Sequence, residues 1–149
     1  MAQTIKIKNY SDVNEEYKAH AAITPGHLVF LNSDNEVAVH AVEGGSVLPM
    51  FAVEDELQGK GIDDAFSAGN VVSVWVPGRG DIVNAILADG EDVAIGDMLV
   101  SHGDGTLKKF DAASEGIAEW PNCIVGVATT AVDMTVSEDP DGRIEVRIY

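Results

Sequence analysis

The chain has 149 residues, of which 46% are hydrophobic and 23% charged, and this is typical of one globular domain rather than of a disordered chain. Nine Lys and Arg against 25 Asp and Glu give a net charge of −16, which excludes non-specific binding to nucleic acid and attraction to an anionic membrane. One cysteine excludes a disulfide-built scaffold. No apolar run has the length of a signal peptide or a membrane helix, so we expect a soluble intracellular product, or one released by lysis.

Apolar and polar residues alternate with period two along much of the chain, which predicts β-strands. The alternation is clearest at residues 4–8 and 143–149, and β-branched and aromatic residues make 71–76 an equally clear strand. A strand at 130–136 is predicted to pair with the C-terminal one. Shorter apolar runs predict further strands at residues 27–31, 37–42, 48–53, 81–87, 98–101, 107–110 and 123–128.

Clusters of Gly, Pro, Asn and Asp separate these runs, and no long amphipathic helix lies between them. Short helical pieces are predicted at residues 12–21, at 63–68 before Gly69, and at 112–117. The sequence therefore predicts an all-β, barrel-like or sandwich fold with short helical pieces. We divide it into an N-terminal strand or arm with a short helix (residues 1–22) and a β-rich part (residues 23–149), which together form one compact domain.

Residues that serve in catalysis or metal binding elsewhere do not form a recognisable site in this sequence. Ser101, His102 and Asp104 are almost contiguous, whereas a catalytic triad is assembled from separated segments, so they predict a tight turn. Cys123 lies in an apolar strand and is predicted to be a buried hydrophobe. The four histidines lack the spacing of a zinc site: His20, His27, His40 and His102. We expect no enzyme, no cofactor and no metal.

Two further short segments, which could be taken for binding motifs, also predict turns. Arg79, Gly80 and Asp81 match an integrin-binding tripeptide, but they lie where a turn leads into the next strand. The acidic clusters at residues 89–92 and 138–141 do not fit the twelve-residue calcium loop.

Two passages carry a family resemblance: residues 85–109 (AILADGEDVAIGDMLVSHGDGTLKK) and 124–133 (IVGVATTAVD). The first contains G-x-x-V-x-x-G-D-x-L-V followed by G-D-G-x-L-K, and the second contains I-V-G-V-A. Residues 23–30 (ITPGHLVF) and 50–55 (MFAVED) follow the same pattern. The arrangement resembles the capsid decoration, or cement, proteins of tailed bacteriophages.

The resemblance implies a β-tulip or barrel-like domain on the outer surface of the virion capsid, after synthesis in the host cytoplasm. It also implies a homotrimer that clamps neighbouring subunits of the major capsid protein once the shell has expanded. The contacts would be mechanical and would add by multivalency. Neither nucleic acid nor membrane is among the implied partners.

Four residues are candidates for contact with the capsid or with a second copy. The clean alternation of residues 4–8 leads us to predict an arm that adds a strand to another chain, with Ile5, Ile7 and Tyr10 in the contact. Trp120 lies beside Pro121 in a predicted loop, and tryptophan is favoured at interfaces. Trp75, inside the strand at 71–76, is predicted to be a core residue.

Other readings remain open from sequence alone. A G-D-x-L pattern before a Gly-rich turn also occurs in biotinyl and lipoyl carrier domains, for which Lys108 or Lys109 would be the modified residue. A small-ligand-binding barrel and a tail or head-fibre component of a virion are further alternatives. An enzyme is the least favoured of these.

Overall fold

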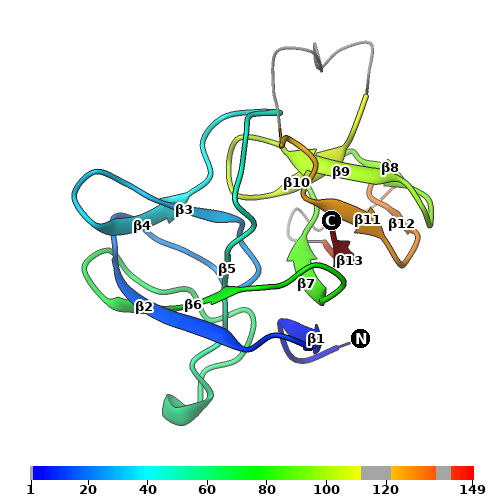
Figure 1. Ribbon diagram of the computed structural model, residues 1–149. Coiled ribbons are helices and arrows are strands. Elements are labelled where there is room, and N and C mark those ends of the chain that lie inside the picture. Colours follow the sequence, from blue (N-terminus) through cyan, green and yellow to red (C-terminus); the bar gives the residue numbers. More distant parts are fainter. Residues whose placement is uncertain (1, 112–121, 137–141) are drawn as a thin grey trace.

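The computed structural model describes residues 2–111, 122–136 and 142–149 (Figure 1). Strands dominate them, which confirms the predicted all-β class, and η1 (Glu56–Gln58) is the one helical element in these ranges. None of the described helical residues form a helix long and apolar enough to cross a membrane. The strands are β1 (Lys6–Lys8), β2 (Val13–Ala19), β3 (Val29–Leu31), β4 (Glu36–Val39), β5 (Phe51–Ala52), β6 (Val71–Val76), β7 (Ile82–Ile86), β8 (Asp92–Val93), β9 (Met98–Ser101), β10 (Leu107–Lys109), β11 (Gly126–Ala128), β12 (Val132–Asp133) and β13 (Arg143–Ile148).

One half of the molecule is a five-stranded sheet in the order β3-β4-β2-β6-β5 (Figure 1). Strands β2 and β4 run parallel, and the other neighbouring pairs run antiparallel. Its two edges meet, because Leu28 bridges Phe51 and the N–H of Val29 donates to the carbonyl of Met50 at 2.9 Å. The sheet thereby closes into a small barrel. Its core consists of Ala19, Ile23, Val29, Val37, Met50, Ala52, Val72 and Val74.

The other half is a six-stranded antiparallel sheet in the order β1-β7-β13-β11-β9-β10. This sheet curls as well, since Leu87 forms a bridge with Leu107 and the N–H of Ala88 donates to the Leu107 carbonyl at 2.8 Å. A two-stranded ribbon of β8 and β12 lies beside it.

A second, larger core joins the two halves. Alternation along β6 places Val72 and Val74 in the barrel and turns Trp75 to the opposite face. Trp75 is fully buried there with Ile5 and Val83, which confirms its prediction as a core residue. Residues 1–22 contribute β1 to one sheet and β2 to the other, so this segment is part of both halves.

The helix predicted at residues 12–21 is wrong, because these residues form β2. Six consecutive residues of β2 pair with β6, from Val13 opposite Val76 to Lys18 opposite Val71. The segment also alternates: Tyr17 packs against the barrel core and Ala19 is buried in it, while Lys18 between them is exposed. Pairing and burial outweigh the helix propensity of Glu, Lys and Ala.

Two other local predictions are also corrected. Residues 63–68 form no helix; instead Phe66 and Ile23 make an antiparallel bridge with backbone hydrogen bonds of 2.8 and 3.0 Å. The strand predicted at 130–136 is shorter, β12, and pairs with β8 rather than with the C-terminal strand. The helix predicted at 112–117 lies outside the described residues.

Candidate interaction surfaces

The N-terminal strand is paired within its own chain. Lys6 lies opposite Val83 of β7, and the N–H of Ile5 donates to the carboxylate of Glu54 at 3.2 Å. The side chain of Ile5 is fully buried in the core, so it is not exposed for a contact with another chain in this structure. This placement corrects the expectation of a free arm. Ile7 is half-buried.

Of the other predicted contact residues, Tyr10 lies within the described part of the chain and Trp120 lies outside it. The ring of Tyr10 is 70% exposed, and Lys8 Nζ lies 5.7 Å from its centroid. The contact roles of Tyr10 and Trp120 therefore stay predictions.

The tripeptide at residues 79–81 forms the turn between β6 and β7. Asp81 is fully buried and accepts a hydrogen bond from the N–H of Gly78 at 2.8 Å. A buried carboxylate that caps its own turn is not presented to a receptor, so the prediction of a turn is confirmed.

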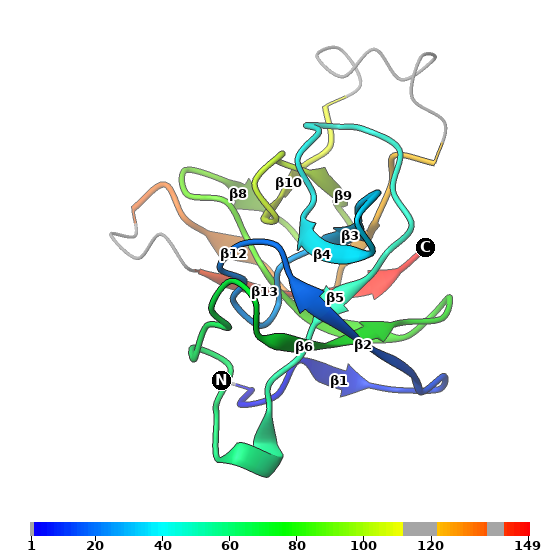
Figure 2. The same cartoon turned by 90° about the vertical axis from the view of Figure 1, so that its left-hand side faces the viewer.

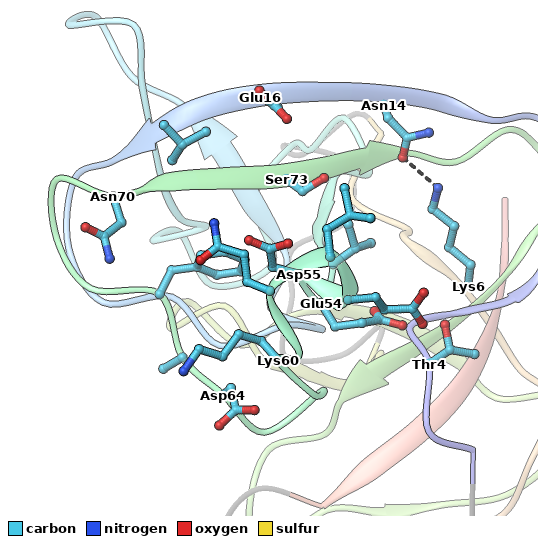
Figure 3. Close-up of a pocket in the computed structure, with 17 residues that line it drawn as sticks. Thr4, Lys6, Asn14, Glu16, Glu54, Asp55, Lys60, Asp64, Asn70 and Ser73 are labelled. Atoms are coloured by element: carbon cyan, nitrogen blue, oxygen red, sulfur yellow. Dashed lines mark hydrogen bonds between the residues drawn. The ribbon is translucent and has the colours of Figure 1, made fainter.

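A cleft of about 840 Å³ opens between the barrel, the N-terminal strand and the segment that follows β5 (Figure 3). Thr4 and Lys6 form one side of the cleft, and Asn14 and Ser73 line the wall made by β2 and β6. The remaining lining residues are Glu16, Val53, Glu54, Asp55, Glu56, Leu57, Gln58, Lys60, Asp64, Ala65, Phe66, Asn70 and Val71.

The cleft is acidic, because five of its lining residues are carboxylates and two are lysines. Lys6 is already engaged, since its Nζ lies 2.6 Å from both Asp12 Oδ1 and Asn14 Oδ1. Hydrogen bonds from Lys6, which contributes most, and from Asn14 and Asn9 lower the pKa of Asp12 from 3.8 to about 2. No three His, Cys, Asp or Glu side chains of the described ranges are grouped to hold a metal ion.

Residues 55–59, which we call the hook, project at the mouth of this cleft. Backbone hydrogen bonds close its turn, from Gln58 and Lys60 N–H to the Asp55 carbonyl at 3.2 and 3.0 Å. Gly59 ends the turn in the left-handed region at φ +72°, where a side chain would be strained. Leu57, at the tip, is 100% exposed. The hook therefore presents one apolar side chain on an acidic loop.

A second hollow, of about 490 Å³, lies beside the C-terminal residue, and we call it the socket. Leu48 and Tyr149 are 66% and 65% exposed at its surface. The guanidinium of Arg79 lies 5.3 Å from the Tyr149 ring centroid. The lining residues are mostly apolar: Ser46, Val47, Leu48, Pro49, Asn122, Ile124 and Tyr149.

The predicted turn at residues 101–104 is confirmed as the connection between β9 and β10, with Gly103 and Gly105 at positive φ. Ser101 does not pair with His102 but with His40, whose Nδ1 lies 2.7 Å from the Ser101 hydroxyl. Nε2 of His40 lies 3.2 Å from the Ser46 carbonyl, and burial lowers the pKa of the ring. Both side chains are buried, so this hydrogen-bonded pair links the end of β9 to the segment after β4.

The remaining candidates are also placed in the framework. Cys123 is a buried free thiol, as predicted. Lys108 and Lys109 lie within β10 rather than at a hairpin tip, and they pair with Glu43 at 2.6 Å and Asp97 at 2.8 Å. A carrier domain presents its lysine at an exposed tip, so this placement does not favour the carrier reading.

Sequence reasoning missed the cleft, the hook and the socket. The cleft and the socket each combine segments far apart in the chain, for example Leu48 with Tyr149. The hook had one local signal, an isolated leucine among acidic residues before a glycine.

No protein-family model matches the sequence, and neither does any curated protein. The fold, however, is similar to a solved structure, the N base of the head fiber protein gp8.5 of bacteriophage phi29. The TM-score is 0.59 at 17% sequence identity, and the match covers 93% of this chain and 95% of the other. The two chains therefore share a fold over nearly their whole lengths.

Proposed function

We propose that this chain is a structural protein of a bacteriophage virion, which binds the outside of the expanded capsid as trimers and stabilises contacts between major capsid subunits. The observation that carries the proposal is the likeness in fold to the base of a phage head fiber over 93% of the chain. The decoration-protein pattern in residues 85–109 and 124–133 supports it independently.

In this proposal the chain is not an enzyme and takes no cofactor. Its partners are the major capsid protein and further copies of itself, and neither nucleic acid nor membrane is bound. The net charge of −16 suits a surface that must not bind packaged DNA or join other particles non-specifically. Many weak contacts per shell then add to a strong hold.

A second candidate is the base of a head fibre, and the fold shared with the base of the phi29 head fiber favours it. The two candidates differ in stoichiometry and in what else is attached. A decoration protein covers the capsomers, whereas a fibre base carries a distal fibre.

Quantitative mass spectrometry of purified virions tests the proposal. The copy number of this chain is measured against the major capsid protein. A ratio near one to one supports the decoration role, and a much lower ratio together with a fibre on the head supports the fibre base. Absence from the particles contradicts both candidates.

A further inference from the structure

The hook offers an exposed apolar side chain beside carboxylates, and the socket offers an apolar hollow with an arginine next to it. We propose that the hook of one copy binds the socket of the next, so that copies associate head to tail into a closed ring. This inference rests on the proposed function, because it names the contact between the copies of the proposed trimer.

Leu57 is the apolar anchor of the contact. Its side chain is 100% exposed, although the turn that carries it is closed by three backbone hydrogen bonds and a left-handed glycine. The loop thus holds a leucine in water at a fixed place. Burial of a leucine is worth roughly one to two orders of magnitude in affinity.

The socket offers the apolar surface that such an anchor needs. Leu48, Pro49 and Ile124 line a hollow of about 490 Å³, and the ring of Tyr149 forms part of its wall. Leu48 and Tyr149 are both largely exposed in a single copy. An apolar pocket filled by one side chain and rimmed by polar groups is typical of an interface hot spot.

The distribution of charge favours a second copy of this chain as the partner of the hook. The hook carries the carboxylates of Asp55 and Glu56 beside Leu57, and Arg79 lies next to the socket, 5.3 Å from the centroid of the Tyr149 ring. In the described part of the chain Arg79 makes no ion pair. With only nine Lys and Arg, two copies repel each other over most of their surfaces. A contact that brings the acidic hook to Arg79 avoids that repulsion.

The two surfaces lie in different parts of one copy. The coiled ribbon of η1 is at the bottom of both views, and the C-terminus next to the socket lies well above it (Figures 1 and 2). A hook therefore does not reach its own socket. When each copy binds one neighbour through its hook and another through its socket, the interface is heterologous, and a rotation that closes produces a ring.

The experiment measures the mass of the full chain by sedimentation over a range of concentrations. We expect Leu57→Asp and Leu48→Asp each to raise the dissociation constant of the oligomer at least tenfold. The matched control is Ile95→Asp, which places the same charge at a leucine-sized side chain that is 70% exposed on another loop and should leave the oligomer intact. Circular dichroism shows whether each variant is folded.

A mixture of the two variants gives the sharpest result. Leu48→Asp retains an intact hook and Leu57→Asp an intact socket, so the mixture should form a heterodimer with one working contact. An interface in which the hook meets the hook, or the socket meets the socket, does not give this recovery. A charge exchange adds a second readout: Glu56→Arg and Arg79→Glu each weaken association, and their combination restores it.

Three outcomes overturn the contact: a chain that stays monomeric at every concentration, oligomers unaffected by Leu57→Asp, or a mixture without heterodimers. The copy number in virions is independent of these results. An oligomer unaffected by Leu57→Asp on a chain that covers the capsid refutes the hook and socket and leaves the proposed function standing. Absence from virions refutes the proposed function whatever the variants do.

Discussion

The carboxylate of Asp81 accepts the backbone N–H of Tyr10 at 2.7 Å, across 71 residues of sequence. Its other oxygen accepts the N–H of Gly78, so one buried side chain ties the start of the chain to the turn between β6 and β7. This bond holds the backbone of Tyr10 while its ring stays exposed.

Replacement of Asp81 by alanine should lower the free energy of unfolding by about 3 kcal/mol, because two backbone donors lose a charged acceptor. Urea denaturation followed by circular dichroism measures the loss. Asp81→Asn, which keeps one oxygen acceptor, should lose less. Asp34→Ala, at an exposed turn, is the matched control and should change little. Equal stability of Asp81→Ala and the unmodified chain would refute this role.

Arg143 joins β13 to two loops of the other half of the molecule. Its guanidinium side chain is 5% exposed and donates to the carbonyls of Pro25 at 3.0 Å and Ile62 at 2.7 Å. A lysine at this position has one ammonium group in place of the planar guanidinium that reaches both carbonyls. We therefore expect Arg143→Lys to lower the free energy of unfolding by about 2 kcal/mol, measured by chemical denaturation. Arg147→Lys, on the exposed side of the same strand, serves as control. Equal effects of the two substitutions would contradict the bridging role of Arg143.

Gly126 allows β11 and β13 to approach closely. A Cβ at this position would lie 2.4 Å from the backbone oxygen of Arg147, which cannot move without breaking the strand pair. We therefore expect Gly126→Ala to destabilise the chain by about 3 kcal/mol or to prevent folding. At Gly80, where the space is open, the same substitution should cost only about 1 kcal/mol for its positive φ. Thermal melting compares the two, and similar melting temperatures would count against the close approach.

His40 should make stability depend on pH. Burial lowers the pKa of its ring below the ordinary 6.5, so the folded chain keeps it neutral where the unfolded chain binds a proton. Stability is therefore lost as the pH falls from 6.5 towards the lower pKa of the folded state. Urea midpoints measured across this range should fall for the unmodified chain and fall less for His40→Gln, whose amide stays neutral. An unchanged slope in the variant would assign the effect to other groups.

Local patterns predicted the strands well where alternation matched the pleat, as at β6 and β13. They failed at β2, because Glu15, Glu16 and Lys18 favour a helix locally, and their pairing with β6 is not visible in the local sequence. Ile5 was expected on an arm for a similar reason: a strand with one apolar face does not reveal whose sheet it joins. The pairing of β1 with β7, the bond between the Ile5 N–H and Glu54, and the burial of Ile5 show that the sheet is its own.

The interaction surfaces were beyond local reasoning for a further reason. An exposed leucine is common and is informative only when its neighbours in space are known. Leu57 gains meaning from the turn that fixes it, and Leu48 from its nearness to Tyr149. Neither the fixed turn around Leu57 nor the nearness of Leu48 to Tyr149 can be recognised from neighbouring residues in the sequence.

The place of β13 bears on how the chain is made. This strand lies inside the six-stranded sheet, between β7 and β11, although both of those precede it in the sequence. While the ribosome is still adding residues before 143, β7 and β11 each present an unpaired edge. Unfinished copies on one messenger RNA therefore expose the same two unpaired strand edges, which can pair with one another until β13 takes its place between them. Synthesis at low temperature or with added chaperones should therefore raise the soluble yield.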